Sequence, residues 1–332
     1  MKIAFFEIKD WEKEIIPQYG EKLGADYFIN EVENACDQAK EYEILSTFIY
    51  SDLSSKILKK LPRLKMIATR STGFNHIDLD YCQKHKIAVA NVPSYGENTV
   101  AEHAFGLILA LSRRIIESVD RVRQGGFSPT GLTGFDLKSK TLGVVGVGRI
   151  GQWLVKYGKA FGMKVLGVTR HRDLKEEKKL GYRWVTLEEC LEQADIVSLH
   201  VPYSPQTHHL INRQNIKRMK PGSLLINTSR GPVVESEAIL WALEQGILSG
   251  AGLDVLEEEE VLDKPWALFD SYINRDDLQE LVTAHILREK PNVLITPHNA
   301  FNTKEAIERI VKTTYENIKN FLAGQPTNLV TR

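Results

Sequence analysis

The stretch Gly143-Val144-Val145-Gly146-Val147-Gly148-Arg149-Ile150-Gly151 decides the fold of this chain. A short apolar run leads into the pattern G-x-G-x-x-G, and a predicted helix continues to about Phe161. In such a turn Gly146 permits the bend, Gly148 lets the backbone approach phosphate groups, and Gly151 lets the helix lie close to the strand. The start of the helix then favours an anion. A glycine-rich turn without a ligand can share this pattern, but a second predicted strand at 163–168 favours a dinucleotide site.

The composition excludes several classes of partner. The chain has 332 residues, enough for two domains that each bury a core. Its 43 Lys and Arg residues balance 43 Asp and Glu residues, so net charge does not favour nucleic acid or an anionic membrane. No stretch approaches the ~20 apolar residues of a membrane helix, and the apolar start is too short for a signal peptide. We therefore expect a cytoplasmic protein that binds neither nucleic acid nor membrane.

The three cysteines, Cys36, Cys82 and Cys190, are far apart and lack C-x-x-C spacing. Such usage is typical of buried thiols in a reducing compartment. We therefore expect them to be structural, and we expect no metal site.

Predicted strands and helices alternate along the chain in two series. The predicted strands are nearly all apolar and lie at 3–6, 44–49, 65–69, from 142 onward, 163–168, 194–200, 223–227 and 249–254. The main predicted helices lie at about 11–23, before Pro62, at about 99–114 and at about 150–161. Apolar strands of this kind are typical of parallel sheets that helices cover on both faces. The predicted fold class is α/β, with two Rossmann-like doubly wound parallel-sheet domains.

The C-terminal part complicates the boundary between the domains. A last predicted strand at 292–296 and an amphipathic helix from Lys304 to about Leu322 follow the second series, so the C-terminus can return to the first domain. Residues 256–291 are predicted to form a surface loop with short helices. The expected division is 1–99 plus 299–332 for one domain and 100–298 for the dinucleotide-binding domain.

The residue that follows the predicted strand at 163–168 bears on the choice of cofactor. An NAD site usually carries an acid there, about 20 residues beyond the glycines, which binds the ribose hydroxyls. This chain has Thr169 instead, followed by Arg170, His171 and Arg172. A guanidinium binds a 2′-phosphate that a carboxylate would repel. We expect NADP(H) to be favoured and NAD(H) to be possible, although both arginines can also be ordinary solvated charges.

Three segments beyond predicted strands carry a candidate catalytic set: Arg230, Asp254 with Glu259, and His298. In open α/β sheets, ligands bind at the carboxyl ends of the strands. An arginine can anchor the carboxylate of a 2-oxo acid and polarise its carbonyl, while a histidine donates a proton to the new alkoxide. An acid can fix the tautomer of that histidine. These residue types therefore suit hydride chemistry on a 2-oxo acid.

Each of these residues has another interpretation when taken alone. His298 follows a proline at a strand end and can be only a turn residue, and Arg230 can be a surface residue in a salt bridge. Glu259 lies in a run of four glutamates that normally forms a solvated face. Glu258 or Glu260 can therefore take its place, although the spacing from Asp254 favours Glu259.

Several motifs in this order resemble those of the D-isomer-specific 2-hydroxyacid dehydrogenases, most closely their D-lactate dehydrogenase branch. The resemblance covers nearly the whole chain. Its motifs are 70–79, 100–103, 200–202, 227–231, 252–259 and 296–300. It implies hydride transfer between a nicotinamide cofactor and a small 2-oxo or D-2-hydroxy acid, with pyruvate and D-lactate first. It also implies that residues 1–99 plus 299–332 form the substrate domain, with the active site in the cleft between the domains.

The same resemblance implies roles for individual residues. Arg230, Glu259 and His298 would be catalytic, and Asp254 would lie near the nicotinamide and help to tune the pair. The substrate would be bound by Thr72, Gly73, Tyr95, Arg230 and Phe301. The cofactor would contact a larger set: Val100, Gly146, Gly148, Arg149, Ile150, Gly151, Thr169, Arg170, Arg172, Val201, Pro202, Thr207, Thr228, Ser229, Asp254, His298 and Ala300.

Departures from the family pattern leave the preferred substrate open. Asn302 stands where several lactate enzymes carry tyrosine. Thr72 stands where a phosphite-oxidising relative would carry lysine, and Glu259 where formate enzymes have glutamine, so both relatives are disfavoured. Glyoxylate or hydroxypyruvate reduction is an alternative function. A non-enzymatic dinucleotide-sensing scaffold of the corepressor kind is another, although the intact Arg, Glu and His weigh against it.

The predicted helix from Val100 to Arg114 bears on assembly, because it is apolar on much of its surface. A helix that is apolar nearly all round is buried. Since the nucleotide domain covers one side, we expect the other side to meet a second subunit, as in the family's twofold dimers. The expected assembly is a homodimer.

Overall fold

The computed structural model describes residues 1–9, 12, 15–20, 23–257 and 275–330. The chain divides into two compact units, of which unit 1 comprises Met1–Gly96 and Asn302–Arg332 and unit 2 comprises Glu97–Phe301. The predicted boundaries lie a few residues away from these divisions. The difference arises because Glu97 begins a helix of unit 2, and because Asn299 and Ala300 hydrogen-bond to Asp254 of that unit.

Unit 1 is built on a parallel sheet in the order β2-β1-β3-β4-β5. This order is one of the two common arrangements of doubly wound sheets. Its strands are β1 (Ile3–Phe5), β2 (Asp26–Tyr27), β3 (Ile44–Thr47), β4 (Met66–Thr69) and β5 (Ala88–Ala90). Its α-helices are α1 (Ile16–Gly20), α2 (Cys36–Ala39), α3 (Ser55–Leu58), α4 (Leu79–Lys84) and α13 (Lys304–Leu322).

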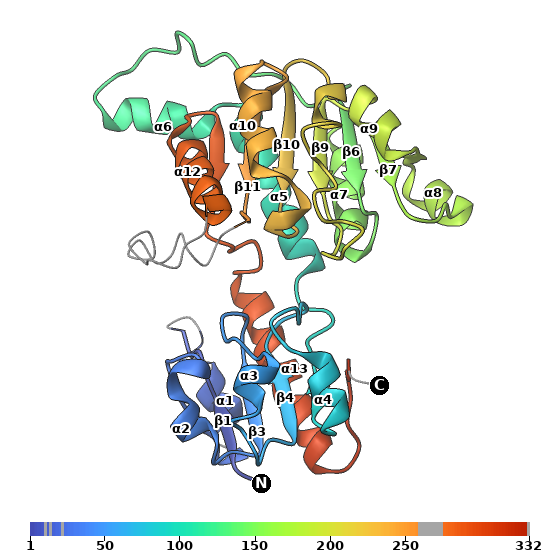
Figure 1. Ribbon diagram of the computed structural model, residues 1–332. Helices are drawn as coiled ribbons and strands as arrows, with labels where there is room; N and C mark the ends of the chain where they lie inside the picture. Colours follow the sequence, from blue (N-terminus) through green and yellow to red (C-terminus); the bar gives the residue numbers. More distant parts are fainter. Residues whose placement is uncertain (10–11, 13–14, 21–22, 258–274, 331–332) are drawn as a thin grey trace. The chain divides into compact units, whose positions relative to one another are not determined.

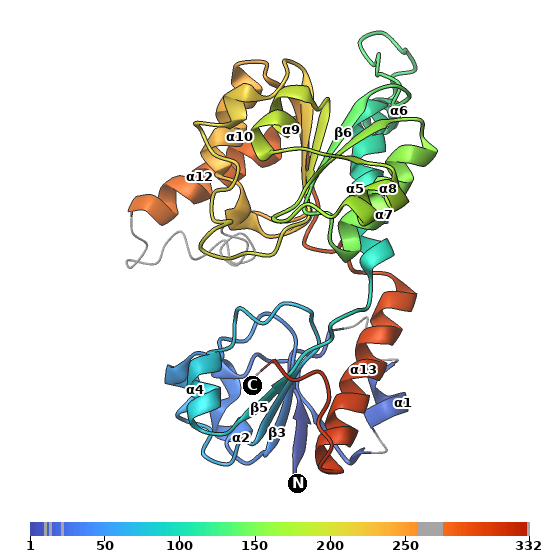
Figure 2. The same cartoon turned by 90° about the vertical axis from the view of Figure 1, so that its right-hand side faces the viewer.

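Helices cover both faces of this sheet, because alternate residues of a strand face opposite sides. In β1, Ile3 and Phe5 pack in one core with residues of α1 and α13, whereas Ala4 packs in the other with residues of α2, α3 and α4. Figure 2 shows α1 and α13 together on one side of the sheet and α4 on the other. The C-terminal tail then returns to the sheet, where Leu329 forms an antiparallel bridge with Ala90 of β5.

Unit 2 is built on a parallel sheet in the order β12-β11-β10-β9-β6-β7-β8. Its strands are β6 (Thr141–Val145), β7 (Lys164–Val168), β8 (Arg183–Trp184), β9 (Ile196–Leu199), β10 (Ser223–Asn227), β11 (Leu248–Leu253) and β12 (Val293–Ile295). The chain runs outward from β6 in one direction through β7 and β8, and in the other from β9 to β12. The direction in which successive strands are added to the sheet reverses between β6 and β9, and a doubly wound sheet binds its ligand at this point.

Two helical layers cover this second sheet. Its α-helices are α5 (Glu97–Ser112), α6 (Ile115–Arg123), α7 (Arg149–Ala160), α8 (Leu174–Leu180), α9 (Leu187–Gln193), α10 (Ser236–Glu244) and α12 (Arg275–Glu289). Residues of α5 and α7 form one core with the sheet, and residues of α9, α10 and α12 form the core on its other face. Figure 1 shows these elements around the strands. The predicted α/β class with two doubly wound parallel sheets is confirmed.

Some elements differ from their predictions. The segment 256–291, expected to hold only short helices, contains α12, whose Ala284 and Leu287 are buried. The helix predicted to reach Arg114 ends at Ser112, and α6 starts separately because Arg114 has a left-handed backbone with φ 51° and ψ 44°. Of the helix predicted at about 11–23, the described residues show only α1. None of the helices in the described ranges is both long and apolar enough to cross a membrane.

The cysteines differ in their surroundings. Cys82 and Cys190 are buried as expected, and burial raises the pKa of each thiol to about 12. Cys36 is only half-buried, contrary to expectation, and its Sγ lies 3.5 Å from the carbonyl oxygen of Glu33. It is the first residue of the short helix α2, in which only Ala39 is buried.

Candidate active site

The glycine-rich turn joins β6 to α7 at the carboxyl end of the sheet in unit 2. Gly146 has a φ of +95°, and a Cβ there would lie 2.5 Å from the carbonyl oxygen of His200. A Cβ on Gly151 would lie 2.2 Å from the carbonyl oxygen of Gly146. Both glycines are therefore required by close approach of the backbone, as the motif predicts.

Gly148 differs from these two glycines, because a Cβ there would meet nothing within 4 Å and the fold alone does not require glycine. It precedes α7, whose first turn contains no acidic residue and whose dipole places a partial positive charge at this end. Arg149 is exposed, with Nη1 3.9 Å from Oε1 of Glu97, and Ile150 is half-buried. The open space beside Gly148 at a positive helix end fits the pyrophosphate of a dinucleotide.

The residues that follow β7 form a turn beside this site. Thr169 Oγ1 donates to the carbonyl oxygen of His171 at 2.8 Å. Arg172 donates to Glu177 through Nε at 2.9 Å and Nη2 at 3.2 Å, and this pairing raises the pKa of Arg172 and lowers that of Glu177. Arg170 is exposed, and no hydrogen bond or ion pair of its guanidinium to any described residue is found. The two arginines therefore differ, because only Arg172 is bound by an acid.

His200 follows β9 beside the glycine turn. Its Nε2 lies 2.9 Å from Ser198 Oγ, and its Nδ1 is buried without a hydrogen-bond partner among the described residues. Desolvation lowers the pKa of this imidazole to about 4, so that the ring is neutral near pH 7. Val201 and Pro202 continue into a loop that Thr207 closes, since Thr207 Oγ1 donates to the Pro202 carbonyl oxygen at 2.7 Å.

The carboxyl ends of β10, β11 and β12 lie next to one another. Their register aligns the last residues of the three strands, and Arg230, Asp254 and His298 follow within a few residues of those ends. Neighbouring strands lie about 4.8 Å apart, so β10 and β12 are separated by roughly 10 Å. The arginine, the aspartate and the histidine therefore leave the sheet at one edge.

The buried carboxylate of Asp254 organises the loop that carries His298. It is 1% exposed. Its Oδ1 accepts from the Asn299 N–H at 3.0 Å and from Thr296 Oγ1 at 2.5 Å, and its Oδ2 accepts from the Ala300 N–H at 2.9 Å. The N–H of His298 donates to the backbone carbonyl oxygen of Asp254 at 2.9 Å, and the φ of His298 is +47°. These bonds hold the histidine in a left-handed backbone that a free loop would avoid.

The loop that carries Arg230 is closed by its own side chains. Asn227 Nδ2 donates to the Arg230 carbonyl oxygen at 3.0 Å, and Arg230 Nη1 donates to the Ser229 carbonyl oxygen at 2.7 Å. The next residue, Gly231, lies against the segment after β11, because a Cβ on it would be 1.8 Å from the carbonyl oxygen of Leu256. The arginine loop is thus packed directly on the segment that leads toward Glu259.

Glu259 itself lies outside the described residues, as do the alternatives Glu258 and Glu260, so its catalytic role stays a prediction. The last described residue before them is Glu257. Its Oε1 lies 2.5 Å from His209 Nε2, and its Oε2 accepts from the N–H of Ser236 at 2.7 Å. The start of that segment is therefore fixed.

The remaining residues expected at the cofactor lie in unit 2. Val100 is buried in α5, and Ala300 is buried beside Asp254. Ser229 Oγ donates to Asn227 Oδ1 at 2.7 Å. Thr228 is 8% exposed, and its Oγ1 has no hydrogen-bond partner among the described residues. Such a buried hydroxyl at the carboxyl end of β10 fits a site that receives a polar ligand.

The residues expected at the substrate are divided between the units. Thr72 and Gly73 follow β4 of unit 1, where Asn91 Nδ2 donates to the Thr72 carbonyl oxygen at 2.8 Å. Tyr95 is half-buried in the same unit. Phe301 ends unit 2 and is 8% exposed.

Comparisons with known proteins identify the family. The family model described as D-isomer specific 2-hydroxyacid dehydrogenase, NAD binding domain, matches residues 105–300. The chain is 36% identical to a glyoxylate reductase of Thermococcus litoralis, over 99% of this chain and 91% of that protein. It is 35% identical to a D-lactate dehydrogenase of Escherichia coli, over 99% of this chain and 100% of that protein. This chain belongs to the D-isomer-specific 2-hydroxyacid dehydrogenase family.

A solved structure of a family member shares the fold of this dehydrogenase. It is the D-lactate dehydrogenase from Aquifex aeolicus complexed with NAD and lactic acid, with a TM-score of 0.90 and 38% identity over 100% of this chain and 99% of that one. The predicted family and the 2-hydroxyacid dehydrogenase function are confirmed. The protein is an oxidoreductase with an NAD-binding Rossmann domain.

No pattern in the sequence predicts two contacts that the structure of this dehydrogenase shows. His103 Nε2 of α5 lies 3.0 Å from Thr296 Oγ1, which ties the helix to the loop of His298 across 193 positions. The second is the contact between His209 and Glu257, which joins residues 48 positions apart. Both pairs depend on how distant strands and loops meet, and neither has a spacing that predicts it.

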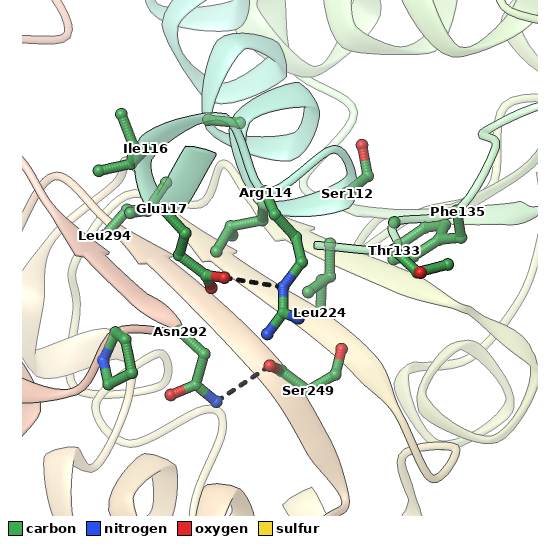
Figure 3. Close-up of a pocket in the computed structure, with 14 residues that line it drawn as sticks. Ser112, Arg114, Ile116, Glu117, Thr133, Phe135, Leu224, Ser249, Asn292 and Leu294 are labelled. Carbon is green, nitrogen blue, oxygen red and sulfur yellow. Dashed lines mark hydrogen bonds and ion pairs between the residues drawn. The ribbon is translucent and has the colours of Figure 1, made fainter. Parts of the chain in front are cut away.

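A cavity of about 170 Å³ in this dehydrogenase lies away from these residues, at the amino ends of β10 and β11. Figure 3 shows Arg114 in an ion pair with Glu117, with Nε 3.0 Å from Oε2, and the Asn292 amide donating to the Ser249 carbonyl oxygen at 3.0 Å. Ligands of doubly wound sheets bind at the opposite, carboxyl end. The cavity is therefore distinct from the candidate active site.

Proposed function

We propose that this dehydrogenase reduces pyruvate to D-lactate, with Arg230 binding the carboxylate and His298 acting as the proton donor. In this reaction the carbonyl carbon gains a hydride and the carbonyl oxygen gains a proton, while the reduced nicotinamide is oxidised. The nicotinamide supplies the hydride when it is bound. The remaining steps belong to the protein, which binds and orients the oxo acid and holds the proton.

One observation carries the proposal, namely the shared edge at which Arg230, Asp254 and His298 leave β10, β11 and β12. A guanidinium there binds a carboxylate through two parallel hydrogen bonds and polarises the adjacent carbonyl. An imidazolium within reach of the carbonyl oxygen donates the proton that the alkoxide needs. We assign Glu259 to orient this imidazole, with Thr72, Gly73, Tyr95 and Phe301 completing the substrate contacts.

The cofactor choice follows from the turn after β7. We propose that NADP(H) is favoured, with Arg170 as the residue that binds the 2′-phosphate. Thr169 supplies no carboxylate to repel that phosphate, and Arg172 is already paired with Glu177. Arg170 is exposed and available to form a charge-assisted bond with the phosphate. NAD(H) lacks the 2′-phosphate, so in this proposal it binds through the pyrophosphate turn without Arg170.

We propose a homodimer as the assembly. The helix α6 exposes Ile115, Ile116, Val119 and Val122 by 41–54%, and Phe127 in the following loop is 93% exposed. Several exposed apolar side chains on one helix are typical of an interface between subunits. In α5 the apolar residues are mostly buried, so α6 contributes more exposed apolar surface than the helix expected from the sequence. Sedimentation as a 37.6 kDa species at micromolar concentration would contradict the dimer.

A spectrophotometric panel tests the function directly. Pyruvate, phenylpyruvate, glyoxylate and hydroxypyruvate are each reduced with NADPH and with NADH, and the product of pyruvate is separated on a chiral column. We expect pyruvate reduction to D-lactate, with higher kcat/KM for NADPH than for NADH. Preference for glyoxylate or hydroxypyruvate would instead support the second candidate, which the 36% identity to a glyoxylate reductase favours. Tenfold or greater preference for NADH would reject the role of Arg170.

A further inference from the structure

The loop that follows β4, residues 70–75, is bound by a chain of buried amides that starts in the C-terminal helix α13. Asn317 of α13 is 1% exposed, and its Nδ2 donates to the Asn91 carbonyl oxygen at 2.8 Å. Asn91 in turn donates through Nδ2 to the Thr72 carbonyl oxygen at 2.8 Å. Two side-chain amides thus connect the C-terminal helix to this loop, which we name the substrate loop.

The C-terminal tail closes the other side of this connection. Asn317 Oδ1 accepts from Asn328 Nδ2 at 2.8 Å and from Thr327 Oγ1 at 3.3 Å. The N–H of Asn91 also donates to the Asn328 carbonyl oxygen at 3.2 Å. Asn317 can therefore neither rotate nor exchange its donor and acceptor without breaking bonds on both sides.

A second contact from the same helix reaches another expected substrate residue. Arg309 Nε donates to the Tyr95 carbonyl oxygen at 2.5 Å. The start of the substrate loop is also fixed, because Arg70 is fully buried and donates through Nε to Glu12 Oε1 at 2.6 Å. What the amides of Asn91 and Asn317 add is control of the peptide that follows Thr72.

We propose that Asn317 and Asn91 are positioning residues, which orient the Thr72–Gly73 peptide toward the substrate carboxylate. A trans peptide is planar, so its C=O and N–H point in opposite directions. The bond from Asn91 fixes the Thr72 carbonyl oxygen and therefore fixes the direction of the Gly73 N–H. This inference rests on the proposed function, in which the backbone at Thr72 and Gly73 binds that carboxylate.

Two variants break the connection at different places. Asn317→Leu removes the donor to Asn91 and keeps the size of the side chain. Asn328→Gly removes the amide of the tail without strain, because Asn328 has a φ of +53° that glycine tolerates. Gln325→Ala is the matched control, since it removes an exposed amide of the same tail. The readouts are KM for pyruvate, kcat, the dinucleotide Kd, and hydrogen exchange of the peptide that covers 70–75.

We expect Asn317→Leu to raise KM for pyruvate about tenfold, with kcat changed less than about twofold, as for loss of one buried hydrogen bond. Asn328→Gly should raise KM about threefold, and both should speed exchange in the substrate loop. The dinucleotide Kd and the Gln325→Ala control should not change. If Asn317→Leu does not fold, the KM and the hydrogen exchange of Asn328→Gly test the inference.

Unchanged KM together with unchanged loop exchange in a folded, active variant would overturn the inference. The outcome is separate from that of the proposed function. If the unaltered protein reduces none of the oxo acids, the proposed function fails, and loop exchange alone then shows whether the two asparagines hold the loop.

Discussion

The N–H of Ala300 donates to Oδ2 of Asp254 at 2.9 Å, which anchors the loop of His298 to the end of β11. The same carboxylate also accepts from Asn299 and Thr296, so it binds residues on both sides of His298, whose backbone is left-handed. The position of the His298 side chain therefore depends on Asp254, because the Asp254 carboxylate binds the chain on either side of His298.

Asp254→Asn tests this support. An asparagine places an NH₂ group against groups that donate hydrogen bonds to the carboxylate, so one or two buried hydrogen bonds are lost. We therefore expect kcat/KM to fall about 10- to 100-fold. Asp195→Asn is the matched control, since Asp195 Oδ2 accepts from the Thr141 N–H at 2.7 Å near the other end of the sheet. It should lower thermal stability and leave kcat/KM nearly unchanged. Equal losses of activity in both variants would contradict the specific role of Asp254.

His298→Gln tests the proton donor. Glutamine retains hydrogen-bonding ability but cannot donate a proton as an acid, so we expect kcat to fall by about 10²- to 10⁴-fold. Dinucleotide binding, followed by fluorescence titration, should be retained. His85→Gln alters an exposed histidine of unit 1 and should leave turnover unchanged. A His298→Gln enzyme with near-normal turnover would show that another group is the acid.

The sequence predicts those parts of the fold that depend on local periodicity. The amphipathic helix expected from Lys304 to about Leu322 is α13 with those bounds, and Thr303 caps it by accepting the Ala306 N–H at 3.3 Å. In α12 the charged residues interrupt the apolar period, so the helix has no comparable signal. A periodic pattern identifies a helix only where one face is consistently apolar.

For the candidate site, the order of strands predicts more than the individual residues do. The positions of Arg230, Asp254 and His298 after successive predicted strands indicate one edge of the sheet, and the register places them there. The contact of His103 with Thr296 is different, since it requires knowing that α5 packs beside β11 and the loop after β12. Contacts between distant segments depend on tertiary packing, which no local spacing encodes.

Gly148 and Gly146 give opposite predictions for one substitution. A Cβ on Gly148 meets nothing within 4 Å, so Gly148→Ala should leave the melting temperature unchanged while it occupies the space proposed for the pyrophosphate. We expect its dinucleotide Kd to rise about tenfold or more, as for loss of one to two charge-assisted hydrogen bonds. Gly146→Ala should instead unfold at lower temperature, because its Cβ would lie 2.5 Å from the His200 carbonyl oxygen at a φ of +95°. Calorimetry and fluorescence titration separate the two effects, and equal Kd values for Gly148→Ala and the unaltered protein would reject the proposed phosphate position.

His200 predicts a loss of stability in mild acid. Desolvation lowers its pKa from 6.5 to about 4 in the folded protein, so between these pH values the unfolded chain binds a proton that the folded protein does not. The protonation of His200 therefore leaves the free energy of unfolding unchanged above pH 6.5. As the pH falls from 6.5 toward 4, it lowers the free energy of unfolding by at most about 1.4 kcal/mol per pH unit. His200→Gln has no such proton to bind, so its unfolding free energy should decline less over this window. Urea unfolding of both proteins at intervals between pH 7 and 4 measures the difference, and parallel pH profiles would show that His200 is protonated in the folded state as easily as in the unfolded chain.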